Sequence, residues 1–342
     1  MRHAAASLAF EVNQLQHQAW DAVFATDMLN LAEFRGLAAA NLAALPTVLY
    51  FHENQFAYPS RGEAVDIERD MHFAFTNLLS LLAADAIWFN SQSNLDSLRS
   101  GIQDTLQRMP KLMQPDASRW QARLEQCFAT AEIHHPGIEP LQSSSVSEGP
   151  LHILWAARWE HDKNPEEFFS ALRQLREAQI DIRLSVLGQS YSQTPECFDT
   201  ARQEFSREIV NWGYASSRAE YRSNLQDADV VVSTAHHEFF GIAIAEAMSA
   251  GCIPVLPDRL SYPELVQCDE RFLYADQQGA LAHRLHHLAR MKNSNRSGFA
   301  ELSMFARQFS LRFDWQKQAG AMDESMERLI RKSTSDHNFR ID

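Results

Sequence analysis

Residues 236–255 read HHEFFGIAIAEAMSAGCIPV, and they follow a short apolar run, VVVS, at residues 230–233. The run has the length and composition of a buried strand, and the turn Phe240–Ile242 begins a helix. Gly251 ends that helix before a second apolar run, Cys252–Leu256, which has the character of the next strand. A strand, a helix and a second strand in this order form a βαβ unit with parallel strands, so this stretch predicts an α/β fold.

The same alternation extends through the second half of the chain. Six short apolar runs are predicted to be strands: Leu151–Ala157, Ile182–Leu187, Glu208–Trp212, Val230–Ser233, Cys252–Leu256 and Phe272–Tyr274. Helical periodicity fills the intervals over Pro165–Ala178, Thr194–Ser206, Ala219–Gln226, Ile242–Ala250 and Gly279–Met291. Together they predict a doubly wound parallel sheet, in which ligands bind beyond the carboxyl ends of the strands.

The first half of the chain alternates in the same way with fewer strands. The predicted strands are Ala22–Ala25, Val48–Phe51, Ala86–Asn90 and Ala129–His134, and the predicted helices are Ile67–Ala84, Ser91–Arg99 and Ser118–Cys127. A serine-rich segment, EPLQSSSVSEGP at residues 139–150, has the composition of a linker. We therefore predict an N-terminal domain over residues 1–140, a C-terminal domain over 141–312, and a ligand cleft between them. A C-terminal helix over 313–332 is expected to pack back toward the first domain.

Composition excludes several classes of protein. With 342 residues, 45% of them hydrophobic and 22% charged, the chain is long enough for two globular domains, which excludes disordered and fibrous proteins. The formal net charge of −13 excludes a basic nucleic-acid clamp, although it permits a local basic patch. The four cysteines contain no CxxC pair, so neither a disulfide scaffold nor a zinc module is expected, and a cytoplasmic location fits. The longest apolar stretch, residues 78–89, is far shorter than the roughly 20 residues of a membrane-spanning helix.

Two glutamates flank the helix that follows the 230–233 strand. Glu238 precedes the turn Phe240–Ile242, and Glu246 lies on the helix eight residues later. The start of a helix presents free N–H groups and a positive dipole end, which together bind an anion such as a diphosphate. A carboxylate on either side can accept bidentate hydrogen bonds from a sugar diol. The alternative is an ordinary βαβ unit with two surface glutamates, but the small residues Gly241 and Ala243 favour a binding site.

Two cations follow the first strand of the second half. In the segment AARWEHDKNP, Arg158 comes directly after the strand and Lys163 leads into the next helix. Cations at a strand end can neutralise a diphosphate leaving group as its charge develops. The alternative is a solvated loop with a Glu160–Lys163 ion pair, which contributes little to stability. The anion site predicted at the same edge of the sheet favours the functional interpretation.

A histidine and a glutamate end an apolar strand in the first half. His52 and Glu53 lie in the segment LYFHENQFAYP, and a histidine at this place can hydrogen-bond to a substrate or move a proton near neutral pH. The alternative is a histidine that caps a loop. The chain contains neither GxGxxG nor GxxxxGK[ST], so a nicotinamide site and a P-loop have no support.

These segments together resemble a known family of enzymes. ARWEHDKNP, followed by EFFGIAIAEAMSAGCIPV, resembles the retaining GT-B glycosyltransferases that carry a Glu-x7-Glu motif. More narrowly, YFHENQFAYP, RWEHDKNPEEFF, VLGQSY, NWGY, STAHHEFFGIAIAEA and YPEL resemble the tRNA-queuosine mannosyltransferase family. The resemblance implies a GT-B fold, in which two Rossmann-like domains face a cleft.

The resemblance also implies roles for the candidate residues of the second half. Glu246 would bind the ribose hydroxyls of the donor nucleotide, and Glu238 would contact the transferred sugar. Arg158 and Lys163 would hold the diphosphate, with help from the backbone at Phe240, Gly241 and Ile242.

The family's chemistry supplies the remaining expectations. His52 would lie beside the sugar and the acceptor. The family uses GDP-mannose, needs no metal ion or other cofactor, and transfers mannose to the cyclopentenediol of queuosine in a tRNA anticodon. Retention would proceed by attack on the face that the diphosphate leaves, through an oxocarbenium-like transition state.

Two features depart from the family pattern. Relatives begin with a strand and a glycine-containing loop, whereas this chain opens in a helical stretch, so we expect the N-terminal domain to lack its first βα unit. The negative net charge also disfavours a tRNA partner, because tRNA binding depends on phosphate contacts. A local basic patch over residues 99–123 would supply phosphate contacts despite the net charge. The alternative is that these residues form an ordinary solvated face of the protein. The segment holds Arg99, Arg108, Lys111, Arg119 and Arg123 against Asp104 and Asp116.

Other functions are consistent with the same fold. One is donor chemistry of the same kind with another acceptor, such as a lipid or a small glycoside. Another is a catalytically silent GT-B module that binds RNA or protein, and a third is a sugar epimerase that needs no acceptor. Nothing in the residues identifies the nucleotide base or predicts the oligomeric state.

Overall fold

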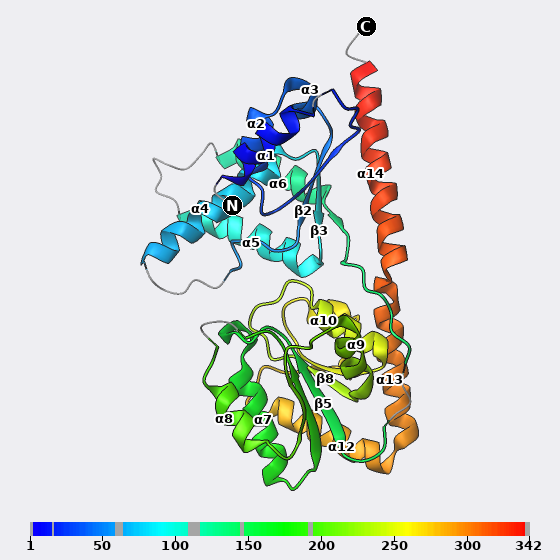
Figure 1. Cartoon of the computed structure of the whole chain (residues 1–342). Coiled ribbons are helices and arrows are strands. Elements are labelled where there is room, and N and C mark those ends of the chain that lie inside the picture. The colour runs from blue at the N-terminus through cyan, green and yellow to red at the C-terminus, as the bar shows by residue number, and fades with distance from the viewer. Residues whose placement is uncertain are drawn as a thin grey trace. The chain divides into compact units, whose positions relative to one another are not determined.

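The computed structural model describes residues 3–15, 17–58, 64–108, 117–143, 147–190 and 194–338. The chain forms two units, an N-terminal unit of Met1–His135 with Gln318–Asp342 and a C-terminal unit of Pro136–Lys317. Each contains a parallel sheet with helices around it, and each is described by itself (Figure 1).

The division between the units falls after His135, whereas the sequence predicts a boundary after residue 140. Ile138 and Leu141 are the reason, because both side chains are buried in the core of the C-terminal unit. The N–H of Ile138 donates to the carbonyl of Phe313 at 2.8 Å, and the N–H of Leu141 donates to Oγ of Ser249 at 3.1 Å. The start of the predicted linker is therefore part of this unit, and residues 144–146 lie outside the described residues.

The N-terminal unit has a parallel sheet with strand order β1-β2-β3-β4. The strands are β1 (Val23–Thr26), β2 (Thr47–Phe51), β3 (Ala86–Phe89) and β4 (Glu132–Ile133). Leu49 is paired with Ile87, and Trp88 with Glu132. β2 is buried along its whole length, as its apolar sequence TVLYF requires of a strand covered on both faces.

Helices cover both faces of this sheet. They are α1 (Ala4–Asn13), α2 (Leu31–Leu37), α3 (Ala40–Ala43), α4 (Ala64–Ala83), α5 (Gln92–Arg108), α6 (Ala117–Ala129) and the part of α14 (Trp315–Asn338) from Gln318 onward. Leu49 and Phe51 point into a core that includes residues of α4, α5 and α6. Tyr50 and Trp88 point to the opposite face and pack against residues of α14, which is the alternation expected of strands.

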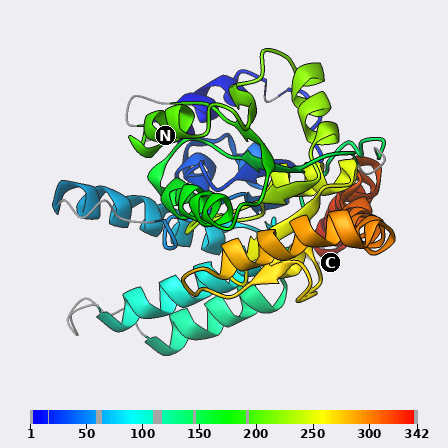
Figure 2. The ribbon, with the colours of Figure 1, turned by 90° about the horizontal axis from the view of Figure 1, so that it is seen from below.

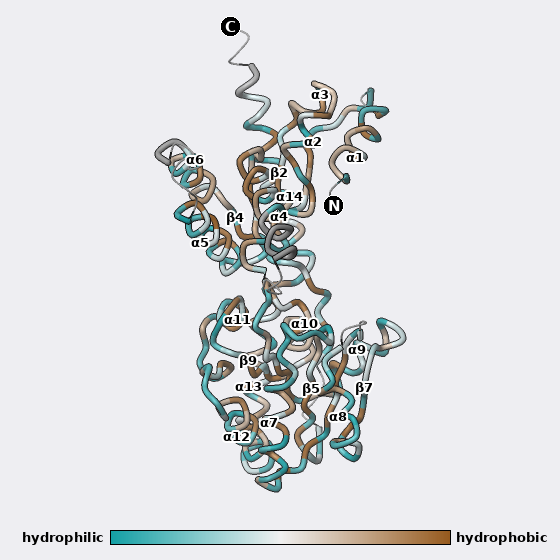
Figure 3. The backbone as a smooth tube through the Cα atoms, turned by 90° about the vertical axis from the view of Figure 1, so that its left-hand side faces the viewer, coloured by the Kyte–Doolittle hydropathy of each residue, from teal (hydrophilic) through white to brown (hydrophobic). Residues whose placement is uncertain are grey.

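The C-terminal unit has a parallel six-stranded sheet with strand order β10-β9-β8-β5-β6-β7, as the alternating pattern predicts. The strands are β5 (Leu151–Ala156), β6 (Ile182–Leu187), β7 (Ile209–Gly213), β8 (Val230–Val232), β9 (Ile253–Pro257) and β10 (Leu273–Tyr274). The apolar segments of this sheet run through the interior of the unit (Figure 3).

Helices pack on the two faces of the second sheet. They are α7 (Pro165–Glu177), α8 (Cys197–Glu204), α9 (Arg218–Asp227), α10 (Ile242–Ala250), α11 (Tyr262–Leu265), α12 (Ala280–Ser294) and α13 (Arg296–Ser310), with 3-10 turns η1 (His161–Lys163) and η2 (Leu311–Phe313). α12 lies beside α7, and α10 lies beside α9 and α13 (Figures 1 and 2).

The strand order reverses between β5 and β8. From β5 the chain proceeds outward to β6 and β7, and it then returns to place β8 on the other side of β5. A reversal of this kind leaves a crevice at the carboxyl ends of the two strands, which is where open α/β sheets bind ligands. The segments that follow β5 and β8 are those that contain Arg158 and Glu238.

Several elements differ from the sequence predictions. The strand predicted over Ala129–His134 is reduced to β4, because α6 continues through Ala129. α5 extends to Arg108, beyond the predicted end at Arg99. Helices α2, α3 and α13 were not predicted, since α2 and α3 are short and α13 begins at an asparagine cap directly after α12.

Among the described residues, no helix is both long and apolar enough to span a membrane.

Candidate active site

The segment after β5 is held by a buried tryptophan. The ring of Trp159 stacks on that of Phe198 with centroids 4.3 Å apart, and the main-chain N–H of Trp159 donates to the carbonyl of Gln189 at 3.0 Å. The neighbouring side chain of Arg158 is 47% exposed, and its Nη1 lies 3.0 Å from Oε2 of Glu160. A fixed backbone with an outward guanidinium is suited to binding an anion at the carboxyl end of the sheet.

Lys163 lies in η1, and its side chain is buried. Nζ donates to the main-chain carbonyl of His237 at 2.6 Å, and it lies 3.2 Å from Oδ2 of Asp162 and 3.6 Å from Oε2 of Glu238. The ammonium is thus surrounded by two carboxylates and a carbonyl, which satisfies a buried charge. The sequence-based alternative, an exposed loop lysine paired with Glu160, is wrong.

Asp162 is ionised beside this lysine. Burial opposes the charge, but the hydrogen bond from His237 and the adjacent Lys163 ammonium outweigh it and lower the pKa of Asp162 to about 2. A permanently charged Asp162 keeps the lysine paired and in place.

The turn before α10 requires a glycine. Gly241 has φ +92°, and a Cβ at this position would lie 3.1 Å from Leu265 and 3.3 Å from Tyr262. Its carbonyl accepts the first hydrogen bonds of the helix, from the N–H groups of Ile244 and Ala245. The N–H groups of Ile242 and Ala243 come before these bonds, in the part of the helix that binds anions.

The two glutamates of the motif lie in different surroundings. Glu238 is partly exposed, and its Oε1 accepts the N–H of Phe239 at 3.1 Å. Glu246 is half-buried, and its Oε2 accepts a hydrogen bond of 2.9 Å from the hydroxyl of Tyr221 on α9. Burial raises the pKa of Glu246, and the hydrogen bond from Tyr221 opposes that shift. Tyr221 therefore holds one oxygen of Glu246 in place.

Two adjoining hollows lie at this end of the sheet. The smaller, of about 180 Å³, is lined by five of the predicted residues, Arg158, Lys163, Glu238, Gly241 and Ile242, together with Tyr262 and others. The larger, of about 640 Å³, is lined by residues of the segments after β6 and β7 and by Tyr221. Both share Ala156, Ala157, Arg158 and Ala243, so the two hollows meet beside the guanidinium.

The two hollows differ in size and lining, so they suit different parts of a ligand. The smaller hollow has two cations, a carboxylate and a helix start, which suit a diphosphate with a sugar attached. The larger is within the range of small-molecule pockets and has a less charged lining, which suits a nucleoside.

Three predicted residues, Glu246, Phe240 and His52, are not among the lining residues of either hollow, although Tyr221, the partner of Glu246, lines the larger one. Phe240 is buried and packs edge-on against Phe313, so only its backbone remains a candidate for contact with an anion. His52 belongs to the N-terminal unit, where it follows β2. Its ring lies 4.4 Å from that of Tyr50, and partial desolvation by the surrounding protein lowers its pKa.

The loop that contains His52 is held by buried asparagines. Nδ2 of Asn90 donates to the carbonyl of His52 at 2.6 Å, and Nδ2 of Asn94 donates to the carbonyl of Phe51 at 3.1 Å. Nδ2 of Asn54 in turn donates to Oδ1 of Asn94 at 2.8 Å. This network fixes the backbone at the carboxyl end of β2.

Sequence reasoning missed three side chains that contact predicted residues: Tyr221 and Tyr262 beside the motif, and Asp27, whose Oδ1 accepts the N–H of His52. Tyr221 and Tyr262 contact the motif from other elements, and no local pattern indicates such contacts. Asp27 directly follows the apolar run of β1, and an acidic residue at a strand end is a signal that could have identified it.

The predicted basic patch falls on α5 and α6. Lys111 and Asp116 lie outside the described residues, as does the side chain of Arg119. The guanidinium of Arg99 lies over the ring of Phe128 at 5.7 Å, and Arg123 donates to Gln126.

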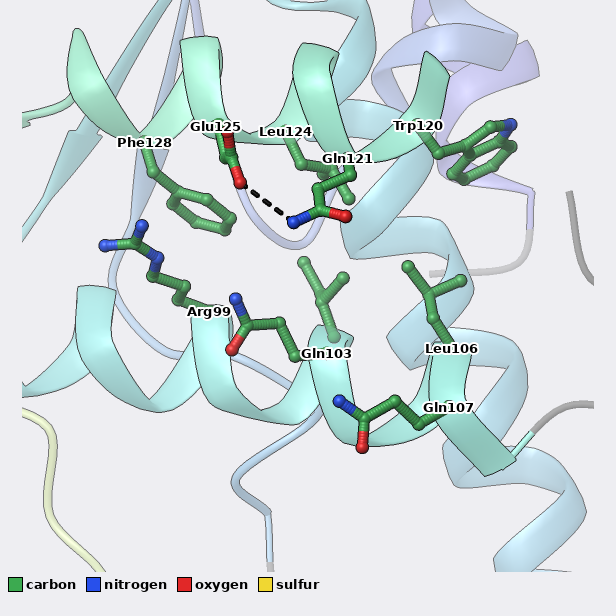
Figure 4. A pocket seen from close by; sticks show the side chains of 10 residues that line it. Arg99, Gln103, Leu106, Gln107, Trp120, Gln121, Leu124, Glu125 and Phe128 are labelled. Carbon is green, nitrogen blue, oxygen red and sulfur yellow. Dashed lines mark hydrogen bonds between the residues drawn. The ribbon is translucent and has the colours of Figure 1, made fainter. Parts of the chain in front are cut away.

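Between these two helices is a hollow of about 490 Å³, shown in Figure 4. Its lining is largely apolar and includes Leu106, Trp120, Leu124 and Phe128, with glutamines at the edges. The described part of this region therefore combines an apolar groove, edged by amides and by Arg99, with the exposed side chains of Arg108 and Arg123.

Comparison with known proteins identifies both parts of the chain. The family model described as "tRNA-queuosine alpha-mannosyltransferase N-terminal" matches residues 1–125, and the one described as "Glycosyl transferases group 1" matches residues 139–298. The tRNA-queuosine alpha-mannosyltransferase of Drosophila melanogaster is 36% identical over 284 residues, which cover 80% of this chain and 72% of that protein.

Other curated proteins and solved structures are more distantly similar to the chain. The GDP-mannose:cellobiosyl-diphosphopolyprenol alpha-mannosyltransferase of Xanthomonas oryzae is 32% identical over 107 residues, covering 31% of this chain and 28% of that protein. Among solved structures, Anabaena HepE in complex with UDP has a TM-score of 0.67 at 15% identity, covering 95% of this chain and 82% of that chain. Together the matches show that the chain is a glycosyltransferase with the GT-B fold and that it belongs to the tRNA-queuosine alpha-mannosyltransferase family.

Proposed function

We propose that the protein transfers mannose from GDP-mannose to queuosine in a tRNA anticodon. The observation that carries the proposal is the pair of hollows that meet at Arg158, one with cations, a carboxylate and a helix start, the other large enough for a nucleoside. The names of the Drosophila and Xanthomonas relatives support queuosine as the acceptor and GDP-mannose as the donor. A tRNA acceptor also fits the cytoplasmic location expected from the composition.

The donor would bind with its diphosphate in the smaller hollow. Arg158 and the N–H groups of Ile242 and Ala243 would contact phosphate oxygens, and Lys163 would add positive charge while remaining bonded to His237. Departure of GDP increases the negative charge on the β-phosphate, so these groups stabilise the transition state more than the ground state.

The two glutamates would bind hydroxyl groups of the donor. Glu238 lines the smaller hollow and would accept hydrogen bonds from the mannose. One oxygen of Glu246 accepts a hydrogen bond from the hydroxyl of Tyr221, and its other oxygen would accept one from a ribose hydroxyl. Because GDP-mannose carries an α-linked sugar, an α-mannosyl product requires retention, and we propose attack from the face that GDP leaves. His52 stays a predicted contact of the acceptor.

We further propose that the reaction needs no metal ion, because two cationic side chains accompany the predicted diphosphate position. Addition of EDTA should leave the rate unchanged. A loss of activity that Mg²⁺ or Mn²⁺ restores would contradict this part of the proposal.

The test is transfer of radiolabelled mannose to tRNA. Purified protein is incubated with GDP-mannose and bulk tRNA from cells that contain queuosine, and in parallel with tRNA from cells that lack it. Label should enter only the queuosine-containing tRNA, and UDP-glucose should not replace GDP-mannose. Equal labelling of both tRNAs, or labelling only of a lipid or small glycoside, would contradict the proposed acceptor. Binding of GDP-mannose without turnover would indicate a silent module.

A further inference from the structure

A buried carboxyl in the N-terminal unit has an oxygen without a partner. Asp27 follows β1, and its side chain is only 3% exposed. Oδ1 accepts the N–H of His52 at 2.9 Å, whereas Oδ2 has no hydrogen-bond partner among the described residues. Buried polar atoms are almost always hydrogen-bonded, so an orphaned carboxyl oxygen calls for an explanation.

The protein does not neutralise Asp27 with a cation. Among the described residues it forms no ion pair, and the charged group that acts on it most directly is another carboxylate, Glu53. Burial raises the pKa of Asp27 to about 7, against the hydrogen bond from His52. An ionised carboxyl at this buried position lowers the stability of the protein. Groups that lower stability in this way are typical of ligand-binding and catalytic sites.

Asp27 lines a small pocket of about 130 Å³ at the carboxyl end of β1. The other lining residues are Met28, Asn30, Glu33, Gln55, His72, Phe73, Thr76 and Asn77. Exposed side chains, those of Met28, Glu33 and His72, form its outer wall and can move without disturbing the core. The pocket is far smaller than the roughly 300–1,000 Å³ of a drug-sized ligand site, so it has room for one small ring or a few waters.

The inner wall of the pocket is fixed. Nδ2 of Asn77 donates to the carbonyl of Asp27 at 3.0 Å, and Oδ1 of Asn77 accepts the N–H of Gln55 at 2.9 Å. With the bond from His52 to Oδ1, these contacts hold Asp27 from both its backbone and its side chain. A preorganised acceptor loses little entropy when a ligand binds.

The location favours the acceptor over the donor as occupant. The two hollows suited to a nucleotide sugar lie in the C-terminal unit, within the part that matches the general glycosyltransferase model. Asp27 and its pocket lie within residues 1–125, the part that matches the model specific to tRNA-queuosine mannosyltransferases. A pocket for one small ring in that part fits the small ring that distinguishes queuosine from guanosine.

We propose that this pocket binds the cyclopentenediol of queuosine, with Oδ2 of Asp27 accepting a hydrogen bond from one of its hydroxyl groups. The inference rests on the proposed function for the identity of the acceptor. Asp27 is here an acceptor-binding residue, and its contact with the diol distinguishes queuosine-containing RNA from RNA with guanosine at the same position.

The experiment measures binding, so that it does not depend on turnover. Affinities of the full-length protein are determined for an anticodon stem-loop with queuosine and for the same stem-loop with guanosine. At pH 8, where most of Asp27 is ionised, the wild type should prefer the queuosine stem-loop by about tenfold or more, the size of a hydrogen bond to a charged group. Asp27→Asn keeps an oxygen for the N–H of His52 but puts an amide donor in place of Oδ2, so the preference should fall to about twofold or less.

Three measurements separate recognition from structural damage. Asp27→Asn should leave the affinity for the guanosine stem-loop and for GDP unchanged. Asp85→Asn is the matched control, because it removes the same charge from the amino end of β3 and should retain the preference. Met28→Trp should also abolish the preference by filling the pocket from its exposed wall, which provides a second test if Asp27→Asn fails to fold.

The outcomes are distinguishable. A queuosine preference that persists in Asp27→Asn and Met28→Trp, or that is absent from the wild type, overturns the inference. A wild type that has the preference and loses it in these variants, yet transfers no mannose, supports the inference and contradicts the proposed function.

Discussion

The buried ammonium of Lys163 donates a hydrogen bond of 2.6 Å to the main-chain carbonyl of His237, which lies 74 residues further along the chain. Thr234 donates in return from its hydroxyl to the carbonyl of Lys163 at 2.8 Å, and the N–H of His236 donates to the carbonyl of Asp162. These bonds join the segment after β5 to the segment after β8. Lys163 and Glu238 are therefore held in a fixed position relative to each other, at the point where the strand order of the sheet reverses.

Replacement of Lys163 should affect stability as well as donor binding. Lys163→Met preserves the length of the side chain but leaves the half-buried Asp162 and the partly exposed Glu238 without their cation. We expect the free energy of unfolding to fall by about 3 kcal/mol, as when one partner of a buried ion pair is removed. Denaturant unfolding and calorimetry with GDP measure the two effects. Lys317→Met, at an exposed lysine of the same unit, is the control, and equal stability of the two variants would contradict the assignment.

Arg158 should contribute to turnover and little to stability. Its guanidinium is 47% exposed and lines both hollows, so its removal creates no cavity. Arg158→Ala should lower kcat by about 10²–10³, the range for loss of one group that stabilises developing charge, while the unfolding midpoint stays near that of the wild type. Glu160→Gln, which removes the partner at 3.0 Å and keeps the arginine, should retain most activity. A rate for Arg158→Ala close to that of the wild type would exclude it from the site.

Glu246 and Tyr221 should act together on the donor. The hydroxyl of Tyr221 orients the carboxylate at 2.9 Å, and burial raises the pKa of Glu246. Glu246→Gln should raise KM for the donor about tenfold, because a charge-assisted hydrogen bond to a ribose hydroxyl becomes a neutral one. Tyr221→Phe should have a smaller effect in the same direction. In the double variant, the effects of the two substitutions on KM for the donor should be less than additive. Full additivity would show that Tyr221 does not act through Glu246.

The turn at Gly241 gives a comparison between two glycines. Gly241→Ala puts a Cβ at φ +92° and within 3.1 Å of Leu265, so we expect a loss of about 1–2 kcal/mol in stability and weaker GDP binding. Gly36→Ala lies in α2 with no atom within 4 Å of the added Cβ, and it should be neutral or stabilising by up to about 1 kcal/mol. Thermal unfolding and GDP titration of both variants provide the comparison, and similar behaviour of the two would contradict a special role for the turn.

The pKa of Asp27 predicts a pH-dependent stability. Burial raises it from 3.8 to about 7, so the folded protein binds a proton more tightly than the unfolded chain. This group therefore lowers stability as pH rises from about 4 to about 7, by at most about 1.4 kcal/mol per pH unit, and adds no further change above that range.

Asp27→Asn removes the pH-dependent contribution of this carboxyl to stability. Its stability relative to the wild type should be clearly greater at pH 8 than at pH 5, measured by denaturant unfolding of the full chain. Glu33, Gln55 and His72, which line the same pocket, and the neighbouring Glu53 are unchanged in the variant, so their titration is common to both proteins. A stability difference that does not vary with pH would show that Asp27 stays ionised.

Much of the C-terminal unit could be predicted because its strands are short apolar runs bounded by turns. The run VVVS became β8, and the glycines at 241 and 251 bound α10 in left-handed conformations, as their positions indicate. α13 was missed because it follows α12 almost without a break, and the pattern of one helix runs into the next. In the N-terminal unit the end of α6 overrides the strand predicted over Ala129–His134.

The sequence by itself determined most of the strands and helices of the C-terminal unit and the parallel arrangement of its sheet, and it predicted Arg158, Glu238 and Glu246 as site residues. Those properties depend on side-chain periodicity and on turn residues that are neighbours in the chain. The tertiary structure alone decided that Lys163 bonds to His237, that Tyr221 orients Glu246, and that Asp27 is buried with an oxygen unpaired. These relationships join residues that become neighbours only when the strands are ordered in the sheet, because the energy of each contact depends on burial and on partners that no local pattern records.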